Sequence, residues 1–355
     1  MLSGNRPSIQ QDVPLARWTT LQLGGPARFF TTIRTEPELV EAVRFARDHS
    51  LPVFVLGGGS NLLVHDAGFP GLVLHVAIDG PLETETNDAS HRLLRAPAGK
   101  SWERLVDEVC DQDLSGIECL AGIPGLTGGT PVQNVGAYGQ EVSQTIHAVR
   151  ALDLQTEQFV ELPNAACQFS YRSSLFNSVQ PGRYVVTAVT FRFDIQARPQ
   201  LTYADLIRHF GEAAPSPRQV AAAVREIRSR KGMVLVPGDP DCRSAGSFFK
   251  NPVVPQSVLD HIVASARIAV ETVPHWPAEP GHVKLAAAWL LEHAGFGKGY
   301  AHGPVGISSR HSLALITREG AHTADLLALR DQIRAEVSRT FGVSLEQEPV
   351  ELGSS

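Results

Sequence analysis

Cysteine is scarce in this sequence, with four residues among 355, and no two of them have the C-x-x-C spacing. The histidines form no H-E-x-x-H string, and no cysteine and histidine pair has the spacing of a zinc finger. We therefore expect neither a disulfide framework nor a bound metal. This cysteine usage is typical of a reducing compartment.

Long hydrophobic runs and excess positive charge are also missing. The longest apolar run, residues 285–291, is far short of the roughly 20 residues that cross a bilayer. Residues 1–18 lack the apolar segment of a secretion signal. The 31 basic and 37 acidic residues give a net charge of −6, with no strongly basic stretch that would favour nucleic acid. We expect a cytoplasmic protein with no membrane insertion and no nucleic-acid partner.

The sequence does contain enough apolar residues for a buried core. A content of 43% apolar and 19% charged residues, with a mean hydropathy of −0.05, excludes a disordered chain and a coiled coil. At roughly 150 residues per domain, the length is typical of two domains, or three at most. The 31 glycines and 24 prolines predict many turns.

Hydrophobic periodicity predicts a mixture of helices and strands. The predicted strands cover 28–34, 53–56, 62–64, 72–76, 92–96, 146–152, 158–162, 183–193, 246–250, 305–317 and 343–352. One predicted helix begins at Glu36 and ends before Pro52, and the others cover 102–110, 218–231, 256–266, 284–294 and 323–341. The polar residues 81–91 are expected to form a surface loop.

Two glycine-rich segments are candidate ligand sites. Gly57–Asn61 follows a predicted strand, and its uncovered N–H groups suit a phosphate as well as they suit a plain turn at a sheet edge. The second segment, 116–142, holds seven glycines and two prolines, with polar handles at Thr127, Thr130, Gln133, Asn134 and Tyr138. The two segments together suit a ligand with a diphosphate and a flat ring. The alternative is a long loop packed by its own side chains, although such loops are usually functional.

Three further positions are candidates for chemistry. Ser247 and Lys250 match S-x-x-K, but the S-D-N and K-T-G strings of serine acyl-enzymes do not occur, so Ser247 is instead a candidate proton donor. Arg172 lies among apolar residues and needs either a structural ion pair or an anionic ligand. Glu346 and Glu348 share one face of the last predicted strand, where either could act as an acid.

Taken together, the motifs of this sequence resemble the UDP-N-acetylenolpyruvoylglucosamine reductase (MurB) family. The similar strings occur in the family's order over nearly the whole chain. They are LGGPARFF (23–30), GGGSNLLV (57–64), IPGLTGGTPVQNVGAYGQE (123–141), CQFSYRSSLF (167–176), LTYADL (201–206), GSFFKNP (246–252), KLAAAWLLEHAG (284–295) and LEQEPVELG (345–353). The PVQN wording and the tyrosine of LTYADL resemble the branch that has a substrate-capping tyrosine loop.

The resemblance implies an α+β fold of the vanillyl-alcohol-oxidase type. Two α/β FAD-binding subdomains would cover 1–79 and 80–231, the second including the C-terminal strand 343–355. A C-terminal α/β substrate-binding domain would cover 232–342. The glycine-rich loops at 57–61 and 122–139 contain no histidine or cysteine for covalent attachment, so the FAD is expected to be non-covalent.

The resemblance also implies a role for individual residues. The catalytic trio would be Arg172, Ser247 and Glu348, with Glu346 as the alternative acid because Pro349 replaces a more usual valine. The implied FAD-binding residues are Leu56, Gly57, Gly58, Gly59, Ser60, Asn61, Gly122, Ile123, Pro124, Thr127, Gly128, Thr130, Gln133, Asn134, Gly136, Ala137 and Tyr138. The implied substrate-binding residues are Tyr203, Arg228, Lys231, Asn251 and Lys284, and no metal ligand is implied.

The implied activity is the NADPH-dependent reduction of UDP-N-acetylglucosamine enolpyruvate, with FAD as cofactor, in peptidoglycan precursor synthesis. The residues themselves do not distinguish NADPH from NADH, nor do they indicate an oligomeric state. The stretch 232–246 is longer than is usual in the family and leads to Ser247. The alternatives are a nucleotide- or sugar-binding protein without redox chemistry, a different flavin oxidase, and a serine acyltransferase.

Overall fold

The computed structural model describes residues 7–236 and 238–353 of the chain, which has an α+β architecture. The described residues divide into two compact units. Unit 1 is drawn from 1–13, 27–59 and 70–230, and unit 2 from 14–26, 60–69 and 231–355. Each unit has its own hydrophobic core.

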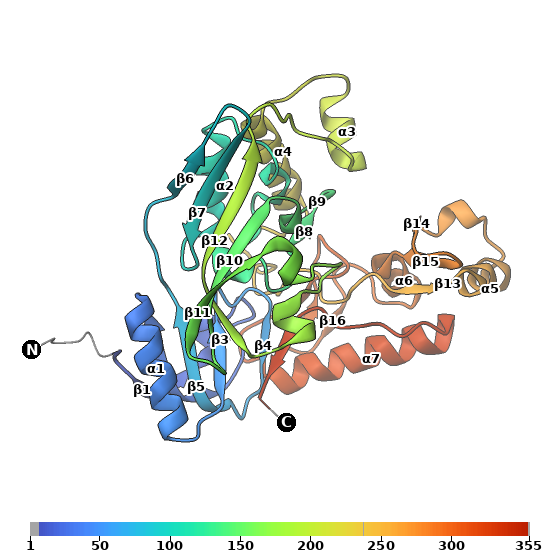
Figure 1. Ribbon diagram of the computed structural model, residues 1–355. Coiled ribbons are helices and arrows are strands. Elements are labelled where there is room, and N and C mark those ends of the chain that lie inside the picture. The colour runs from blue at the N-terminus through green and yellow to red at the C-terminus, as the bar shows by residue number, and fades with distance from the viewer. Residues whose placement is uncertain (1–6, 237, 354–355) are drawn as a thin grey trace, which may run out of the picture. The chain divides into compact units, whose positions relative to one another are not determined.

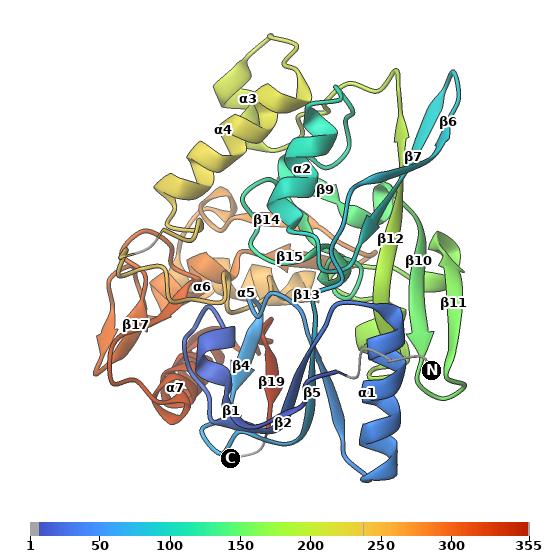
Figure 2. The ribbon, with the colours of Figure 1, turned by 90° about the vertical axis from the view of Figure 1, so that its left-hand side faces the viewer.

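The first sheet of unit 1 has four strands in the order β1-β2-β5-β3, apart from end residues that belong to unit 2. These strands are β1 (Gln10–Pro14), β2 (Pro26–Ile33), β5 (Phe69–Val76) and β3 (Val53–Leu56). Helix α1 (Glu36–Asp48) follows β2 and begins where the Thr35 hydroxyl accepts the N–H of Glu38 (Figure 2). Its buried face belongs to the same core as β5 and consists of Leu39, Ala42, Val43 and Ala46.

The second sheet of unit 1 has five antiparallel strands in the order β11-β10-β12-β7-β6 (Figure 1). They are β11 (Gln158–Pro163), β10 (Ile146–Asp153), β12 (Tyr184–Asp194), β7 (His91–Pro97) and β6 (Glu83–Asn87). The predicted surface loop at 81–91 is wrong, because β6 lies within it. An edge strand buries little, so β6 carries no hydrophobic alternation that would identify it.

Three helices accompany this sheet: α2 (Trp102–Cys110), α3 (Ala204–Phe210) and α4 (Pro217–Arg230). The apolar faces of α2 and α4 enter the core of unit 1, as their spacing predicts. The short strands β8 (Gly136–Ala137) and β9 (Gln140–Glu141) pair within the second glycine-rich segment.

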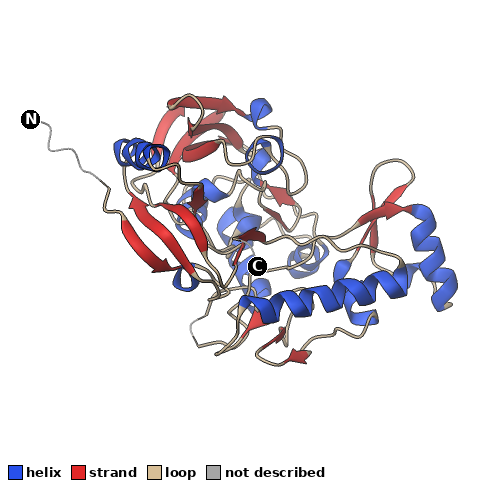
Figure 3. Ribbon diagram, turned by 90° about the horizontal axis from the view of Figure 1, so that it is seen from below, coloured by secondary structure: helices blue, strands red, loops and turns tan. Residues whose placement is uncertain are grey.

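Unit 2 contains short strands and three helices. The sheets have the orders β13-β15-β14, β16-β17-β18 and β19-β4. Their strands are β13 (Val253–Pro255), β15 (His282–Leu285), β14 (His275–Pro277), β16 (Ala301–His302), β17 (Val305–Ile307), β18 (Leu315–Thr317), β19 (Val350–Leu352) and β4 (Leu62–Val64). The helices are α5 (Gln256–Ala266), α6 (Ala287–His293) and the long α7 (Thr323–Phe341) seen in Figure 3.

Several predicted elements of unit 2 are shorter than expected. The helix predicted at 284–294 begins at Ala287 because residues 282–285 form β15, and a short apolar run does not distinguish strand from helix. The strand predicted at 246–250 is an extended segment with one bridge, from Phe249 to Gln347. The strand predicted at 305–317 divides into β17 and β18, and that at 343–352 is regular only in β19.

The C-terminal strand lies in unit 2, where β19 pairs in parallel with β4. The resemblance implies that 343–355 belongs to the second FAD-binding subdomain, which stays a prediction. Pairing between segments almost 290 residues apart leaves no local signal in the sequence. The predicted boundary at 79/80 falls between the two sheets of unit 1, and the three-domain division stays a prediction.

The structure also describes the state of the cysteines and the length of the apolar helices. All four cysteines are described and free, and Cys110, Cys119 and Cys167 are buried. Burial raises the pKa of the Cys110 and Cys167 thiols to about 12, and that of Cys119 is raised as well. None of the helices in the described ranges is long and apolar enough to cross a membrane.

The burial of three thiols predicts a graded thiol titration. In native protein near pH 8, only the half-buried Cys242 should react with a disulfide reagent, because the other thiols are both shielded and protonated below their raised pKa. All four should react in denaturant. Cys242→Ser should remove the native reaction, and rapid modification of any second thiol in folded protein would contradict this packing.

Candidate active site

The first glycine-rich segment follows β3 at its carboxyl end. Leu56 is buried as the last residue of β3. In the described part of the chain, the N–H groups of Gly58 and Gly59 donate to no protein acceptor. Two adjacent donors at the end of a strand are suited to an anionic group. Leu56–Gly59 belong to unit 1, whereas Ser60 and Asn61 belong to unit 2.

Asn61 has a contact that the sequence did not predict. Its side-chain amide donates to the carbonyl oxygen of Glu348 over 3.3 Å, and its own carbonyl accepts the N–H of Val350 over 3.0 Å. Asn61 thus fixes the backbone of the segment that carries the predicted acid. The sequence suggested only a role in cofactor binding.

The second glycine-rich segment is held by a turn at residues 98–102. The Lys100 carbonyl accepts two hydrogen bonds from Thr127, one from its N–H over 2.9 Å and one from its hydroxyl over 3.0 Å. The Ala98 carbonyl accepts from the Gly128 N–H over 2.8 Å, and the Trp102 N–H donates to Gly125 over 3.1 Å. These main-chain bonds fix the shape of residues 125–128.

The two glycine-rich segments meet backbone to backbone within unit 1. A β-carbon placed on Gly58 would lie 2.7 Å from the Cα of Gly125, closer than side chains tolerate. Gly128 is similarly confined, because its β-carbon would lie 2.6 Å from that of Ala98. The two segments therefore form a cradle of main chain packed against main chain, and a side chain on Gly58 would force them apart.

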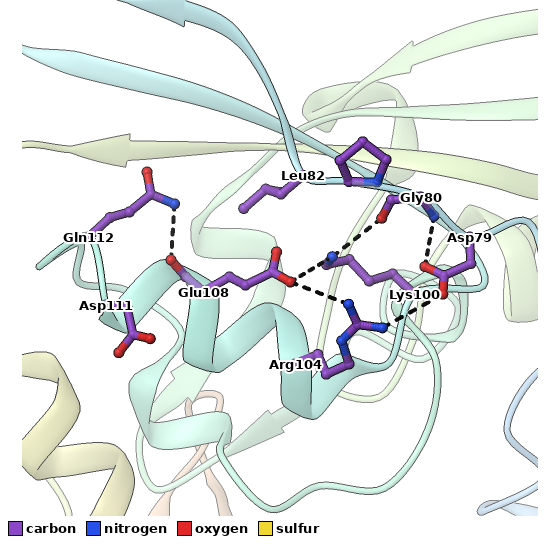
Figure 4. Close-up of a pocket in the computed structure, with 9 residues that line it drawn as sticks. Asp79, Gly80, Leu82, Lys100, Arg104, Glu108, Asp111 and Gln112 are labelled. Atoms are coloured by element: carbon purple, nitrogen blue, oxygen red, sulfur yellow. Dashed lines mark hydrogen bonds and ion pairs between the residues drawn. The ribbon is translucent and has the colours of Figure 1, made fainter.

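Lys100 of the 98–102 turn also lines a surface pocket (Figure 4). The Lys100 side chain is only 1% exposed, and its Nζ lies 2.9 Å from Glu108 Oε1 and 3.4 Å from the Gly80 carbonyl. Arg104 lies 3.8 Å from both Glu108 and Asp79. These charged side chains are paired with one another. We therefore interpret their ion pairs as stabilising the 98–102 turn.

Gly122 and Arg228 join the second segment to α4. The Gly122 N–H donates to Glu103 Oε2 over 2.7 Å, and its carbonyl accepts Arg228 Nε over 3.1 Å. Arg228 is 6% exposed, and burial lowers the pKa of its guanidinium despite its hydrogen bond with Tyr138. The structure thus places Arg228, a predicted substrate-binding residue, against the glycine-rich segment.

Arg172 lies beside the later part of the same segment. Its Nη2 donates to the Gly136 carbonyl over 2.8 Å, and its backbone is left-handed with φ +55°. The buried Asn134 amide donates to Ser170 over 3.0 Å and to Glu141 over 2.9 Å. Asn134 therefore fixes the turn that carries Arg172, a structural role in addition to the predicted FAD contact.

Tyr203 packs on this region from the start of α3. Its ring contacts that of Tyr138 edge to face, with centroids 5.0 Å apart. A β-carbon on Gly139 would overlap the hydroxyl of Thr202. Tyr203 is 41% exposed, so a large aromatic surface remains open to a ligand.

In unit 2, the main chain brings Ser247 close to Glu348. The Glu348 N–H donates to the carbonyl of Phe248, the neighbour of Ser247, over 2.9 Å. The Lys250 N–H donates to Glu346 over 2.9 Å, and its Nζ pairs with Glu346 Oε1 at 2.5 Å. The Glu346 carboxylate is thus engaged by Lys250 at an exposed position.

This pairing bears on two alternatives from the sequence. Lys250 forms an ion pair with Glu346, so its ammonium is engaged by a carboxylate. The acyl-enzyme pattern therefore lacks its base. Glu348 is the residue whose backbone is hydrogen-bonded next to the serine, which favours it over Glu346 as the acid.

The remaining predicted residues are divided between the units. Ile123, Pro124, Gln133 and Ala137 lie partly buried in the second glycine-rich segment of unit 1, and Thr130 is buried there. Lys231, Asn251 and Lys284 belong to unit 2. Asn251 Oδ1 accepts the N–H of Ala287 at the start of α6, and the Lys284 ammonium lies 5.9 Å from the centre of the Trp276 ring. Among the described residues, no three His, Cys, Asp or Glu side chains group as metal ligands.

Comparison with known proteins gives two family matches. Residues 27–162 match the FAD binding domain, and residues 239–352 match the C-terminal domain of UDP-N-acetylenolpyruvoylglucosamine reductase. The chain is 46% identical over 354 residues to the UDP-N-acetylenolpyruvoylglucosamine reductase of Thermobifida fusca, covering 98% of each protein. It is 46% identical to that of Streptomyces coelicolor, covering 96% of this chain and 90% of the relative.

A solved structure is similar over the same extent. The UDP-N-acetylenolpyruvylglucosamine reductase (MurB) from Thermus caldophilus superposes with a TM-score of 0.65 at 27% identity, covering 98% of this chain and 99% of that one. These matches confirm the predicted α+β FAD-binding fold with a C-terminal domain. The main-chain cradle at Gly58 and Gly125 fits FAD, because a diphosphate can be bound by backbone N–H groups without side chains.

The close approach of the two segments predicts a selective glycine requirement. Gly58→Ala should reduce the FAD content of purified protein several-fold, because its methyl group would separate the segments. The matched control is Gly129→Ala, which adds the same methyl group in open space within the second segment. FAD content is measured from the visible absorbance per protein. Equal FAD content in the two variants would contradict the proposed cradle.

Proposed function

This chain belongs to the UDP-N-acetylenolpyruvoylglucosamine reductase family, and from that premise we propose that it reduces UDP-N-acetylglucosamine enolpyruvate to UDP-N-acetylmuramate with NADPH. The family makes it an FAD-dependent oxidoreductase. The observation that carries the proposal is identity of 46% over 98% of both chains, with the glycine cradle at the FAD-matched region. The product is a precursor of peptidoglycan, and the reaction is proposed to occur in the cytoplasm.

FAD, held by the two glycine-rich segments, would supply the transfer of a hydride from NADPH to the β-carbon of the enolpyruvyl double bond. The residues of this chain then have to manage the charge and the proton. Negative charge develops on the α-carbon and spreads onto the neighbouring carboxylate. Arg172, fixed by its bond to the Gly136 carbonyl, is proposed to stabilise that charge.

Ser247 is proposed to donate the proton to the α-carbon, so that hydride and proton together complete the reduction. Glu348 is proposed to act beside it, by stabilising the developing enolate-like state. The support is the main-chain pairing of the Glu348 and Phe248 backbones in unit 2. A positioned proton donor contributes about 10²–10⁴-fold in rate.

Ser247→Ala provides the direct test of this assignment. The variant should bind FAD and accept hydride from NADPH as wild type does, because Ser247 belongs to a separate unit from the cradle. Its reoxidation by the enolpyruvyl substrate should fall by about 10²–10⁴-fold. Stopped-flow absorbance follows each half-reaction separately. Near-normal reoxidation would show that Ser247 is not the donor.

Tyr203 is proposed to cover the bound sugar nucleotide. Tyr203→Ala should weaken substrate binding, seen as a higher KM in the oxidative half-reaction, while flavin reduction by NADPH is retained. The matched control is Ile207→Ala, which truncates another exposed apolar side chain on the same helix. An unchanged KM in Tyr203→Ala would contradict the role.

A binding protein without redox chemistry is the second class to be tested. It would bind the sugar nucleotide but show no NADPH oxidation that depends on the enolpyruvyl group. A comparison with UDP-N-acetylglucosamine, which lacks that group, separates the two.

A further inference from the structure

A buried carboxylate, Asp241, stands six residues before Ser247 in the stretch that is longer than expected. It is 4% exposed, and one of its oxygens, Oδ2, accepts four hydrogen bonds. The donors are the Ser308 hydroxyl at 2.8 Å, the Ser309 hydroxyl at 2.8 Å, the Ser309 N–H at 3.1 Å and Arg310 Nε at 3.3 Å. Asp241 thus binds every residue of the turn from 308 to 310.

The neighbouring Asp239 completes this cluster. Its carboxylate pairs with the guanidinium of Arg310 and accepts the N–H of Asp241 over 2.9 Å. Burial by itself would raise the pKa of Asp241, but the hydrogen bonds from Ser309, Ser308 and Arg310 outweigh that effect and leave the pKa below its ordinary value. Asp241 is therefore an ionised carboxylate at neutral pH.

The turn that Asp241 binds is followed by Leu313, which is hydrogen-bonded to the segment that carries Ser247. The Ser308 N–H donates to Ala314 over 2.9 Å, and the Ala314 N–H donates to His311 over 3.1 Å, which closes the turn. Leu313 accepts the N–H of Phe248 over 2.7 Å.

The chain between Asp241 and Ser247 is bonded to strand β18. The Arg243 carbonyl accepts the N–H of Thr317 over 3.0 Å, and Ser244 bridges to Ile316. A closed circuit results, from Asp241 along the chain to Phe248, across to Leu313, back to Ser308 and through its hydroxyl to Asp241. Ser247 lies inside this circuit, which the Asp241 carboxylate closes, and the ion pair of Asp239 with Arg310 links the same two segments.

We propose that Asp241 is a positioning residue for Ser247, closing the circuit that fixes where the serine hydroxyl is presented to the substrate. This inference rests on the proposed role of Ser247 as proton donor. It gives the long stretch before the serine a function, since its two aspartates secure the segment that follows. A misplacement of about 1 Å can cost about 10²-fold in rate.

The test is the rate of each half-reaction in FAD-loaded Asp241→Asn. Flavin reduction by NADPH should stay at the wild-type rate. Reoxidation by the enolpyruvyl substrate should slow by about 10- to 100-fold, with a larger solvent deuterium isotope effect because proton transfer becomes limiting. Ser309→Ala removes one donor at an exposed position and should shift both readouts in the same direction by a smaller amount.

The matched control is Asp66→Asn in the same unit. Asp66 also accepts two main-chain N–H groups, from Thr323 and Ala324 at the start of α7, but it is outside the circuit. It should lower thermal stability without a selective loss of reoxidation. If Asp241→Asn does not fold, Ser309→Ala decides the matter alone.

The other outcomes would contradict either the positioning role of Asp241 or the proton-donor role of Ser247. Equal losses in both half-reactions of Asp241→Asn, or behaviour like Asp66→Asn, would show that Asp241 is merely structural. Normal reoxidation in Ser247→Ala would instead remove the proton-donor assignment itself. Loss in Ser247→Ala together with normal reoxidation and isotope effect in Asp241→Asn would leave the proposed function intact and reject the positioning role.

Discussion

The contact between Gly58 and Gly125 is the constraint on which the candidate FAD site depends. Two segments from different parts of unit 1 approach so closely that Gly58 cannot carry a side chain without moving the backbone of Gly125. What holds them there is the 98–102 turn, whose carbonyls accept the N–H groups of Thr127 and Gly128. A ligand recognised by main chain requires this kind of support, because a flexible loop would lose its N–H geometry.

In unit 2, the segment that carries the proposed proton donor, Ser247, is positioned mainly by main-chain hydrogen bonds. Ser247 lies on an extended segment bordered by Leu313 on one side and by Glu346–Glu348 on the other. The ion pair of Lys250 with Glu346 belongs to that border and leaves Glu348 beside the serine. The same main-chain pairing therefore favours Glu348 over Glu346 as the proposed acid and argues against an acyl-enzyme.

Much of the fold could be predicted from periodicity and end signals. Helices α1, α2 and α7 lie where the sequence predicts them, and α7 is followed by Gly342 in the left-handed conformation that this C-cap position favours. Local patterns failed where burial was weak or partners were distant. Strand β6 is polar because it is an edge, and β19 is defined by pairing with β4.

The residues of the candidate site also divide into those with a local sequence signal and those without one. The glycine-rich segments could be found from their composition, because glycine at such density has few other uses. Lys100 and Asp241 could not, since a lone lysine and a lone aspartate are normally solvated, and only the folded chain shows that both are buried and bonded. Asn61 and Asn134 were found for one role and have another, which is to fix the backbone next to predicted catalytic residues.

The visible absorption spectrum of the purified protein tests the central claim most directly. The account predicts a yellow flavin spectrum that NADPH bleaches and that UDP-N-acetylglucosamine enolpyruvate restores under anaerobic conditions, with the flavin released on heating because it is not covalently bound. A colourless protein that cannot be reconstituted with FAD, or a reduced flavin that the enolpyruvyl sugar nucleotide does not reoxidise, would contradict it.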